Sequence, residues 1–506
     1  MNRRQFGFLL LMLLVITVPY LAAYQAGGQD FVFGGFLLNP QDGNSYLAKM
    51  EEGRLGAWRF TLPYTAQPGE GAYLFLFYIT LGHLAGWLTL SNVLVFHLAR
   101  LAGAVMLWIA LFRFLAEVFS GEPRRRSRAF LLAIAGSGLG WIAALAGGFT
   151  SDFWVAEAYP FLSMYANPHF PLGLAILIEL LRGSLRPLTL RGATWQALLG
   201  LLLAVIQPFA VVVTAALLGI KSVWESIEAK KFSGWQGVIA AILPGGLFLV
   251  YQYWATLSDP VLSGWNAQNL TASPKVWDFL LSFSPAFLMG MVGLFALAKT
   301  HQLARYRLAV IWFIAGVVLA YLPFNLQRRF LLGFYLPCVL LAVIGVDFLS
   351  ARFKLRFLWP LTVAVALPTN LIILAAGVFG VQSHDPLIYL TRAENQAMEW
   401  VAANTDQASI VLASPQCGMY LPARTGRRVL YGHPFETVNA DEEKQQVIGF
   451  FEGNTAVGQA EAWLTERNVA YIFYGPRERA LGEPPVLETS TAVYQSGDVT
   501  VYAFKK

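Results

Sequence analysis

The sequence has few charged residues, few cysteines and none of the short motifs that mark common enzymes. Charged residues make up 13% of the 506 residues, against about 25% in soluble domains. The two cysteines, Cys338 and Cys417, fall in a predicted membrane span and in a predicted outer domain, so a disulfide between them is geometrically implausible. No zinc-ligand spacing, phosphate-cradling glycine loop or nucleophile elbow is present. The composition therefore excludes an ordinary soluble domain.

Apolar residues are abundant instead, at 56% of the chain with a mean hydropathy of +0.53. Residues 6–23 form an uncharged run that, at about 1.5 Å per residue, nearly crosses a hydrocarbon core of about 30 Å. No convincing signal-peptide cleavage site follows, so we expect a retained first helix. Further runs bring the total to about eleven predicted spans. They lie at residues 92–119, 129–148, 168–181, 195–206, 209–223, 234–257, 276–298, 308–322, 330–349 and 357–381.

The basic residues predict the orientation of these spans. Lys and Arg are retained on the cytoplasmic side, and the basic clusters fall at alternate ends of the spans, all inside if the N-terminus is inside. The net charge of +6 then reflects orientation in the plasma membrane, and we expect no nucleic-acid partner. The clusters are Arg3/Arg4, Arg124/Arg125/Arg126/Arg128, Arg182/Arg186/Arg191, Lys221/Lys230/Lys231, Lys299/Arg305/Arg307 and Arg352/Lys354/Arg356.

Two parts of the chain are predicted to lie outside the cytoplasm. Counting residues 73–90 as a span would reverse the basic clusters, so we predict a helix on the outer membrane surface there, within an outside loop at 24–91. After the last span, charged residues return and short apolar strands alternate with helical patterns. We therefore predict an α-helical polytopic membrane domain at 1–381 and a small extracytoplasmic α/β domain at 382–506. Its expected strands are 409–413, 428–431 and 470–474, with helices around Trp400 and 460–466.

The first candidate site is the stretch Asn39-Pro40-Gln41-Asp42-Gly43-Asn44-Ser45-Tyr46 in the outside loop. A carboxylate at the membrane–water boundary is partly desolvated, which suits a general base. Tyr46 follows Asp42 by four residues, so both would share one helix face. The alternative is that Asp42 is an N-cap of a helix that Gly53 closes. The two roles are compatible.

The second candidate is the outside loop at 151–160, followed by 167–170. It carries Asp152, Glu157, His169 and several aromatic residues. Aromatic faces suit sugar rings, and carboxylates accept hydrogen bonds from hydroxyl groups. The alternative is an interfacial aromatic belt with solvated acids and a histidine satisfied at a helix start.

The third candidate is Gln327, Arg328 and Arg329, which oppose the positive-inside trend because they are predicted to lie outside. Two adjacent arginines there indicate an anionic ligand such as a phosphate held bidentately, and Arg100 near the outer end of its span would join them. Otherwise the arginines reach lipid headgroups, or Arg100 pairs locally.

Three further stretches have structural interpretations of equal or greater weight. Gln207-Pro208 interrupts an apolar stretch and predicts a break between two helices; a substrate contact by Gln207 is the alternative of lesser weight. The stretches 431–437 and 474–479 follow predicted strands, a common position for ligand contacts and equally for plain turns.

The order of these features resembles the GT-C superfamily of membrane glycosyltransferases, which use polyprenyl-phosphate-linked sugars, over residues 1 to about 380. The resemblance is greatest to bacterial members related to protein mannosyltransferases and aminoarabinose transferases. The shared order begins with a first span and a long outside loop that carries an acid and a Tyr at i+4, here Asp42 and Tyr46. The stretch Pro-Gly-Glu-Gly-Ala-Tyr at 68–73 then leads into a surface helix. An Arg-bearing second span (Arg100), a second acidic outside loop and a helix pair interrupted at Pro208 follow.

The resemblance implies an inverting glycosyltransferase, hexosyl or pentosyl, that moves a sugar from a polyprenyl-phosphate donor to an extracytoplasmic glycan, lipid or protein acceptor. Asp42 would be the general base; no cofactor is required, and a divalent metal is compatible. The implied or predicted substrate-binding residues are Tyr46, Arg100, Asp152, Glu157, His169, Gln327, Arg328 and Arg329.

Two other function classes stay open at this point. A transporter or flippase of a lipid-linked or polar substrate would place ionisable groups near the bilayer midplane and show internal repeats, whereas the acids of this chain fall in outside loops. A non-catalytic scaffold that binds envelope polymer would tolerate substitution of Asp42.

Overall fold

The computed structural model describes residues 3–505 and divides into two compact units. The first, here called the helical unit, comprises Met1–Pro19, His97–Val250 and Leu270–Val378. The second, here called the mixed unit, comprises Tyr20–Phe96, Tyr251–Asn269 and Phe379–Lys506. The predicted outside loop therefore belongs to the same compact unit as the C-terminal residues, and the predicted division of domains at residue 381 stays a prediction.

The helical unit contains α- and 3-10 helices within the described residues, and it shares four helices with the mixed unit. The shared helices are α1 (Arg3–Ala26), α4 (Asn92–Val118), α11 (Trp235–Ser258) and α18 (Pro368–Phe379). The others are α5 (Pro123–Ala135), α6 (Gly140–Ala144), η1 (Ser151–Phe153), η2 (Ala156–Ala158), α7 (Pro160–Tyr165), α8 (His169–Gly183), α9 (Leu190–Ile206), α10 (Pro208–Ala229), α13 (Val276–Phe283), α14 (Ala286–Lys299), α15 (Arg307–Ala320), η3 (Gln327–Leu331), α16 (Tyr335–Phe353) and α17 (Leu358–Ala366).

The predicted apolar runs form helices, but fewer of these helices are long enough to cross a membrane than the predicted number of about eleven. Between residues 3 and 505, seven helices are long and apolar enough to cross a membrane, and the pair α13–α14, bent by 82°, makes an eighth if the pair is counted as one span. Three predicted spans form shorter helices, namely α8 with 15 residues, α9 with 17 and α15 with 14. The fold class, a polytopic helical membrane protein with a small α/β part, is confirmed.

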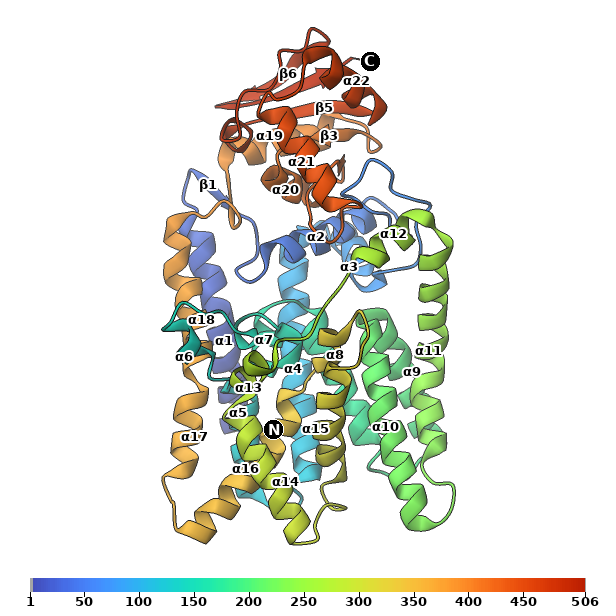
Figure 1. Ribbon diagram of the computed structural model, residues 1–506, viewed down its shortest axis with the longest axis vertical. Coiled ribbons are helices and arrows are strands. Elements are labelled where there is room, and N and C mark those ends of the chain that lie inside the picture. The colour runs from blue at the N-terminus through green and yellow to red at the C-terminus, as the bar shows by residue number, and fades with distance from the viewer. Residues whose placement is uncertain (1–2, 506) are drawn as a thin grey trace. The chain divides into compact units, whose positions relative to one another are not determined.

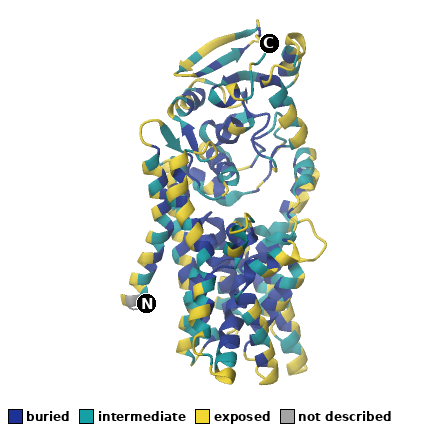
Figure 2. Ribbon diagram, turned by 60° about the vertical axis from the view of Figure 1, so that its left-hand side comes forward, coloured by how far each residue is buried: buried dark blue, intermediate teal, exposed yellow. Residues whose placement is uncertain are grey.

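Burial separates the central helices of the helical unit from its outer ones. In α16, 61% of the apolar span is buried, as expected for a helix that is hydrophobic around its whole circumference. In α11 only 17% is buried, so its apolar side chains are left for lipid. Figure 2 shows the same pattern, with buried residues inside the helix bundle and exposed ones facing outward. The helices α8, α9, α10 and α15 lie side by side (Figure 1).

The mixed unit is built on a five-stranded sheet of order β4-β3-β5-β7-β6. The strands are β3 (Ile410–Leu412), β4 (Arg428–Val429), β5 (Val469–Tyr474), β6 (Ser490–Ser496) and β7 (Val499–Phe504). β3 runs parallel to β4 and β5, and β7 runs antiparallel to β5 and β6. The three predicted strands are confirmed as β3, β4 and β5. A separate pair joins β1 (Phe31–Phe33) to β2 (Tyr389–Thr391).

Helices cover both faces of this sheet (Figure 1). Side chains of α19 (Arg392–Asn404) and α20 (Pro415–Thr425) form one buried cluster with Val411 and Phe473. Side chains of α21 (Ala440–Phe451) and α22 (Val457–Glu466) form another with Leu412 and Ile472. Alternation along β3 and β5 thus supplies two cores, one on each face. Two short helices, η4 (Gly380–Ser383) and α23 (Pro476–Arg479), complete the C-terminal part.

The outside loop contributes α2 (Pro40–Arg54) and α3 (Leu76–Trp87) to the mixed unit, and α12 (Pro260–Gln268) lies in it as well. A helix, α3, is present where the surface helix is predicted, and its position on the outer membrane surface stays a prediction. α2 packs on α3 so closely that a Cβ on Gly53 would lie 2.1 Å from the carbonyl oxygen of Ile79. Gly53 therefore serves this contact inside α2, and the prediction that it closes the helix is wrong. α2 also contacts α20, which joins it to the C-terminal residues.

Candidate functional site

Asp42 is the third residue of α2. The helix begins at Pro40, whose fixed φ and missing N–H suit the first helical position. The preceding Asn39 is the cap, with a left-handed φ of 50°, so the prediction of Asp42 as the N-cap is wrong. A carboxylate in the first turn still interacts favourably with the positive end of the helix dipole.

Both carboxylate oxygens of Asp42 have partners. Oδ2 accepts a hydrogen bond of 2.5 Å from Nδ2 of Asn39, and Oδ1 lies 3.2 Å from Nε2 of His433. The other ring nitrogen of His433, Nδ1, accepts the backbone N–H of Phe435 at 3.1 Å. Neutral His433 therefore carries its proton on Nε2, and this N–H donates a hydrogen bond to Oδ1 of Asp42. The carboxylate is oriented from two sides, and 36% of the Asp42 side chain remains exposed against 3% for His433.

The loop that carries His433 is itself tightly held. The hydroxyl of Thr437 accepts the N–H groups of Gly432 and His433 at 3.4 Å, and the N–H of Thr437 donates to the carbonyl of His433 at 3.0 Å. A Cβ on Gly432 would lie 2.4 Å from the carbonyl oxygen of Gly418, so this position requires glycine. These contacts fix the imidazole before any substrate arrives.

A buried ion pair lies two turns further along α2. Nζ of Lys49, a fully buried residue, is 2.6 Å from Oε1 of Glu436 and 2.5 Å from the hydroxyl of Ser45. Ser45 donates to the same oxygen of Glu436 at 2.6 Å. The ammonium also lies 4.4 Å from the centre of the Phe75 ring, a cation–π contact that offsets part of its desolvation.

The Glu436 carboxyl is kept ionised by this arrangement. Burial alone would raise its pKa, but the charge of Lys49 and the hydrogen bonds from Lys49 and Ser45 hold the pKa below 4.5. Nearby, burial raises the pKa of Glu52 to about 8 against the opposing effects of Thr61 and Lys49. The loop that follows β4 thus supplies the Glu436 carboxylate that pairs with Lys49 and the His433 imidazole that contacts Asp42.

One face of α2 carries these groups. Asp42, Ser45, Tyr46 and Lys49 are spaced i, i+3, i+4 and i+7, the spacing of a single helix face. Tyr46 stacks on Tyr78 of α3 with ring centres 4.4 Å apart. Asp42 and Tyr46 are site residues predicted from the sequence, whereas Ser45 and Lys49 were missed. The spacing i, i+3, i+4 and i+7 in the sequence already indicates that all four lie on one helix face.

The helical unit holds the other predicted residues, and Asp152 is the most enclosed of them. Its Oδ2 accepts the N–H of Gly140 at 3.0 Å, and its Oδ1 accepts the hydroxyl of Thr150 at 2.7 Å and lies 3.3 Å from the hydroxyl oxygen of Ser282. Burial raises its pKa despite these hydrogen bonds. Ser282 donates to Asp278 at 2.7 Å, a carboxylate that sequence reasoning did not single out. Asp152 therefore holds the segment around Gly140 and Thr150 in place, a structural role.

The second and third candidates meet each other in the helical unit. Nε of Arg328 in η3 lies 3.9 Å from Oε1 of Glu157 in η2, and its guanidinium carbon is 4.5 Å from the centre of the Trp154 ring. The Arg329 guanidinium lies 5.5 Å from the Phe209 ring centre. Both arginines thus present cationic faces next to an aromatic side chain, and Arg328 also faces a buried acid. The Gln327 side-chain oxygen accepts the N–H of Ser273 at 3.3 Å.

Arg100, His169 and Gln207 are buried in the same unit. His169 is the first residue of α8, as the sequence predicts, and its ring lies 4.0 Å from that of Phe170. Gln207 separates α9 from α10 at the predicted break. Arg100 donates from Nη1 to the carbonyls of Ile16, Met164 and Tyr165 at 3.2 to 3.4 Å. Within residues 3–505, no group of three or more His, Cys, Asp and Glu is placed to hold a metal ion.

Comparisons with solved structures identify the fold. No protein-family model and no curated protein matches the chain. The oligosaccharyltransferase AglB from Archaeoglobus fulgidus, in complex with an inhibitory peptide and a dolichol-phosphate, aligns with 93% of this chain and 69% of its own, at 15% identity and a TM-score of 0.53. ArnT from Cupriavidus metallidurans, bound to undecaprenyl phosphate, aligns over 98% of both chains, at 13% identity and a TM-score of 0.53.

The chain has the GT-C fold. The match to ArnT reaches beyond residue 380, where the sequence resemblance ends, and includes the C-terminal α/β part. The alignment with ArnT covers 98% of this chain and so includes both the helical unit and the helices α2 and α3 of the predicted outside loop. Identities of 13 to 15% establish the fold alone, so the roles of individual residues depend on their own geometry.

Proposed function

We propose that this protein is a membrane glycosyltransferase that transfers a sugar from a polyprenyl-phosphate-linked donor to an extracytoplasmic acceptor, with Asp42 as the general base. The fold supports the class of enzyme, and the two similar structures were solved with dolichol-phosphate and undecaprenyl phosphate. The observation that carries the assignment of Asp42 is its geometry. Its carboxylate is held on both oxygens by Asn39 and His433 and still keeps an exposed surface.

In this mechanism the acceptor is a hydroxyl or another protic nucleophile. Asp42 takes the proton as the acceptor atom attacks the anomeric carbon from the face opposite the phosphate. The new bond forms while the bond from carbon to phosphate oxygen breaks, and the phosphate leaves with the electron pair, which inverts the anomeric centre. Each carboxylate oxygen has two lone pairs, so the hydrogen bonds from Asn39 and His433 orient Asp42 without occupying all its accepting positions.

We assign recognition of the donor phosphate to Arg328 and Arg329. Guanidinium groups match phosphate oxygens bidentately and stabilise the charge that develops on the leaving group. Trp154 and Glu157 hold the Arg328 side chain in place. Asp152 and Arg100 already satisfy backbone and hydroxyl groups around them, so we assign both to maintaining the helical unit. Tyr46, His169 and Gln327 stay proposed substrate contacts.

The test is transfer by the purified protein in liposomes supplied with a panel of polyprenyl-phosphate sugars and membrane acceptors. The expected product is the acceptor with its mass raised by one sugar, and Asp42→Asn should abolish it. A matched control is Asp441→Asn, because Asp441 also lies in the first turn of a helix whose cap, Asn439, has a left-handed φ. Movement of the donor lipid across the bilayer with no new product would reject the transferase and favour a flippase.

A further inference from the structure

Two cavities flank the turn between α8 and α9 in the helical unit, at the face that the basic residues predict to be cytoplasmic. Their volumes are about 760 Å³ and about 850 Å³. We call them the α10-side cavity and the α9-side cavity. The residues that line both are Gly183, Arg186, Pro187, Leu188 and Gln196. A single ligand seated on this shared wall would therefore contact both cavities.

The α9-side cavity carries excess positive charge. Its lining includes Arg113, Arg182, Arg186 and Arg191 but only one acid, Glu179. Arg182 is paired with Glu179 at 2.5 Å and with Glu117 at 2.9 Å, and Arg186 also pairs with Glu117. Arg113 lies 3.6 Å from Glu179, so three of the four arginines share two carboxylates. The positive charge exceeds the negative, which leaves the cavity attractive to an anion.

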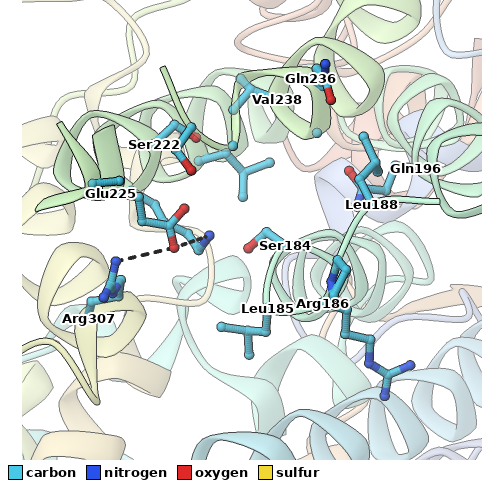
Figure 3. A pocket seen from close by; sticks show the side chains of 18 of the residues that line it. Ser184, Leu185, Arg186, Leu188, Gln196, Ser222, Glu225, Gln236, Val238 and Arg307 are labelled. Carbon is cyan, nitrogen blue, oxygen red and sulfur yellow. Dashed lines mark ion pairs between the residues drawn. The ribbon is translucent and has the colours of Figure 1, made fainter. Parts of the chain in front are cut away.

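The α10-side cavity is polar and nearly balanced in charge. Figure 3 shows Glu225 and Arg307 on the opposite side from Gln196 and Arg186. Glu225 accepts from Lys221 at 2.8 Å and lies 3.3 Å from Arg307. The hydroxyls of Ser184 and Ser222 line the same space. This side suits an uncharged, hydroxyl-bearing group rather than a second anion.

Gln196 lies where the two cavities meet and has an unmet hydrogen-bonding requirement. Its side chain is 5% exposed, and its buried Oε1 has no hydrogen-bond partner within the described residues. Leaving a buried acceptor without a donor costs about 1–3 kcal/mol. A ligand hydroxyl at this position would supply the missing donor.

Exposed apolar side chains on α9, the helix that carries Gln196, indicate that the ligand is a lipid. Trp195 and Leu198 line the α9-side cavity and are 55% and 45% exposed. Tryptophan favours the membrane–water interface, and basic cavities between helices at the cytoplasmic face bind anionic headgroups. Apolar side chains and excess cations on one wall therefore match both parts of an anionic phospholipid.

We propose that this double cavity binds a phosphodiester lipid headgroup that bears hydroxyl groups, of the phosphatidylglycerol type. The phosphate lies at Arg186 and Arg191 in the α9-side cavity, and a headgroup hydroxyl donates to Oε1 of Gln196. The hydroxyl-bearing end reaches the α10-side cavity, and the acyl chains lie along Trp195 and Leu198. The site is separate from Asp42 and does not depend on the proposed glycosyl transfer.

The test is lipid binding to the full-length protein in detergent, measured by native mass spectrometry. Phosphatidylglycerol and phosphatidylcholine are titrated against wild type, Arg186→Gln, Arg191→Gln and Gln196→Leu. The matched control is Arg352→Gln, an exposed arginine of the same predicted face that lines neither cavity. We expect wild type to prefer phosphatidylglycerol, and each cavity variant to bind it about tenfold more weakly, the effect of losing about 1.4 kcal/mol.

Gln196→Leu separates binding from folding, because replacing an unpartnered buried amide by an apolar group does not remove a native hydrogen bond. It should keep the thermal stability of the lipid-free protein while losing the preference for phosphatidylglycerol over phosphatidic acid, which lacks headgroup hydroxyls. Equal binding of phosphatidylglycerol by wild type and all three variants would overturn the proposal. So would displacement of the lipid by inorganic phosphate at equal concentration, which would assign the cavity to a soluble anion.

Discussion

Nε2 of His433 lies 3.2 Å from Oδ1 of Asp42, although the two residues are 391 positions apart in the chain. The contact links the first turn of α2 to a loop that follows β4 of the C-terminal sheet, within the same mixed unit. A buried imidazole with a fixed tautomer thus orients the proposed base. The α/β part of the chain has a direct role in the geometry of the candidate site.

The first prediction concerns this imidazole as a positioning residue. His433→Ala should lower kcat about tenfold with little change in KM, because Asp42 loses one orienting hydrogen bond worth about 1.5 kcal/mol. His433→Gln should retain most of the rate, since its amide N–H groups replace the donor. The measurement is the steady-state rate of both variants across pH.

The control for that series is His301→Gln, an exposed histidine of the helical unit. It should leave the rate unchanged. Equal losses in His433→Ala and His433→Gln, with an altered pH profile in both, would indicate that the imidazole itself transfers a proton and would contradict a positioning role.

The second prediction concerns the Lys49–Glu436 pair. Lys49→Met should destabilise the protein by about 3–5 kcal/mol, because it leaves the buried Glu436 carboxylate uncompensated. The double variant Lys49→Met, Glu436→Leu should recover much of that loss, since apolar replacements of both partners of a buried pair are often neutral. Thermal unfolding of both in the same detergent checks this, and a double variant no more stable than the single one would refute the coupling.

The third prediction is loss of stability in acid. The pKa of Glu436 is lower in the folded protein than its ordinary 4.5, so the unfolded chain takes up this proton first as the pH falls. The stabilisation is complete above about pH 4.5 and is lost as the pH falls through the folded-state pKa. Unfolding temperatures measured from pH 6 to pH 3 should drop more steeply for wild type than for Glu436→Gln. Parallel curves for the two proteins would contradict the ion-pair interpretation.

The fourth prediction concerns the donor phosphate. Arg328→Gln should raise KM for the polyprenyl-phosphate sugar about tenfold, because one charge-assisted hydrogen bond to phosphate is worth about 1.5–3 kcal/mol. Arg328→Lys should restore binding only in part, since a point charge cannot replace a planar guanidinium. Arg356→Gln, an exposed residue of the predicted cytoplasmic face, is the control. An unchanged KM in Arg328→Gln would remove this arginine from donor binding.

Much of the fold could be predicted because it depends on local patterns. Long apolar runs identify the helices, and short continuous apolar runs identify β3 and β5, since the sheet is covered on both faces. The start of α2 was also readable, because Pro40 at the first helical position marks Asn39 as the cap. The preference of Asp for the cap position predicts Asp42 instead, three residues beyond the cap that the structure has at Asn39. Span lengths were less predictable, because an apolar run does not reveal the 82° bend between α13 and α14.

The candidate site was only partly predictable, because its contacts are long-range. The sequence predicts the loop at 431–437 equally as a position for ligand contacts and as a plain turn, and nothing local in the sequence pairs it with α2. Lys49 looks like an ordinary helix lysine, and its burial becomes visible only with Glu436 beside it. The meeting of Arg328 with Glu157 and Trp154 likewise joins two separately recognised loops. Local chemistry identified the parts, and tertiary structure decided which of them combine.

The most direct test of the proposed base is the single-turnover transfer rate of Asp42→Asn with a saturating polyprenyl-phosphate sugar. Asparagine keeps the size of the side chain and one acceptor oxygen but cannot take a proton. We predict a loss of at least about 100-fold, with the unfolding temperature and donor affinity of wild type and with Asp441→Asn fully active. A rate for Asp42→Asn within threefold of wild type would contradict the assignment of Asp42 as the base.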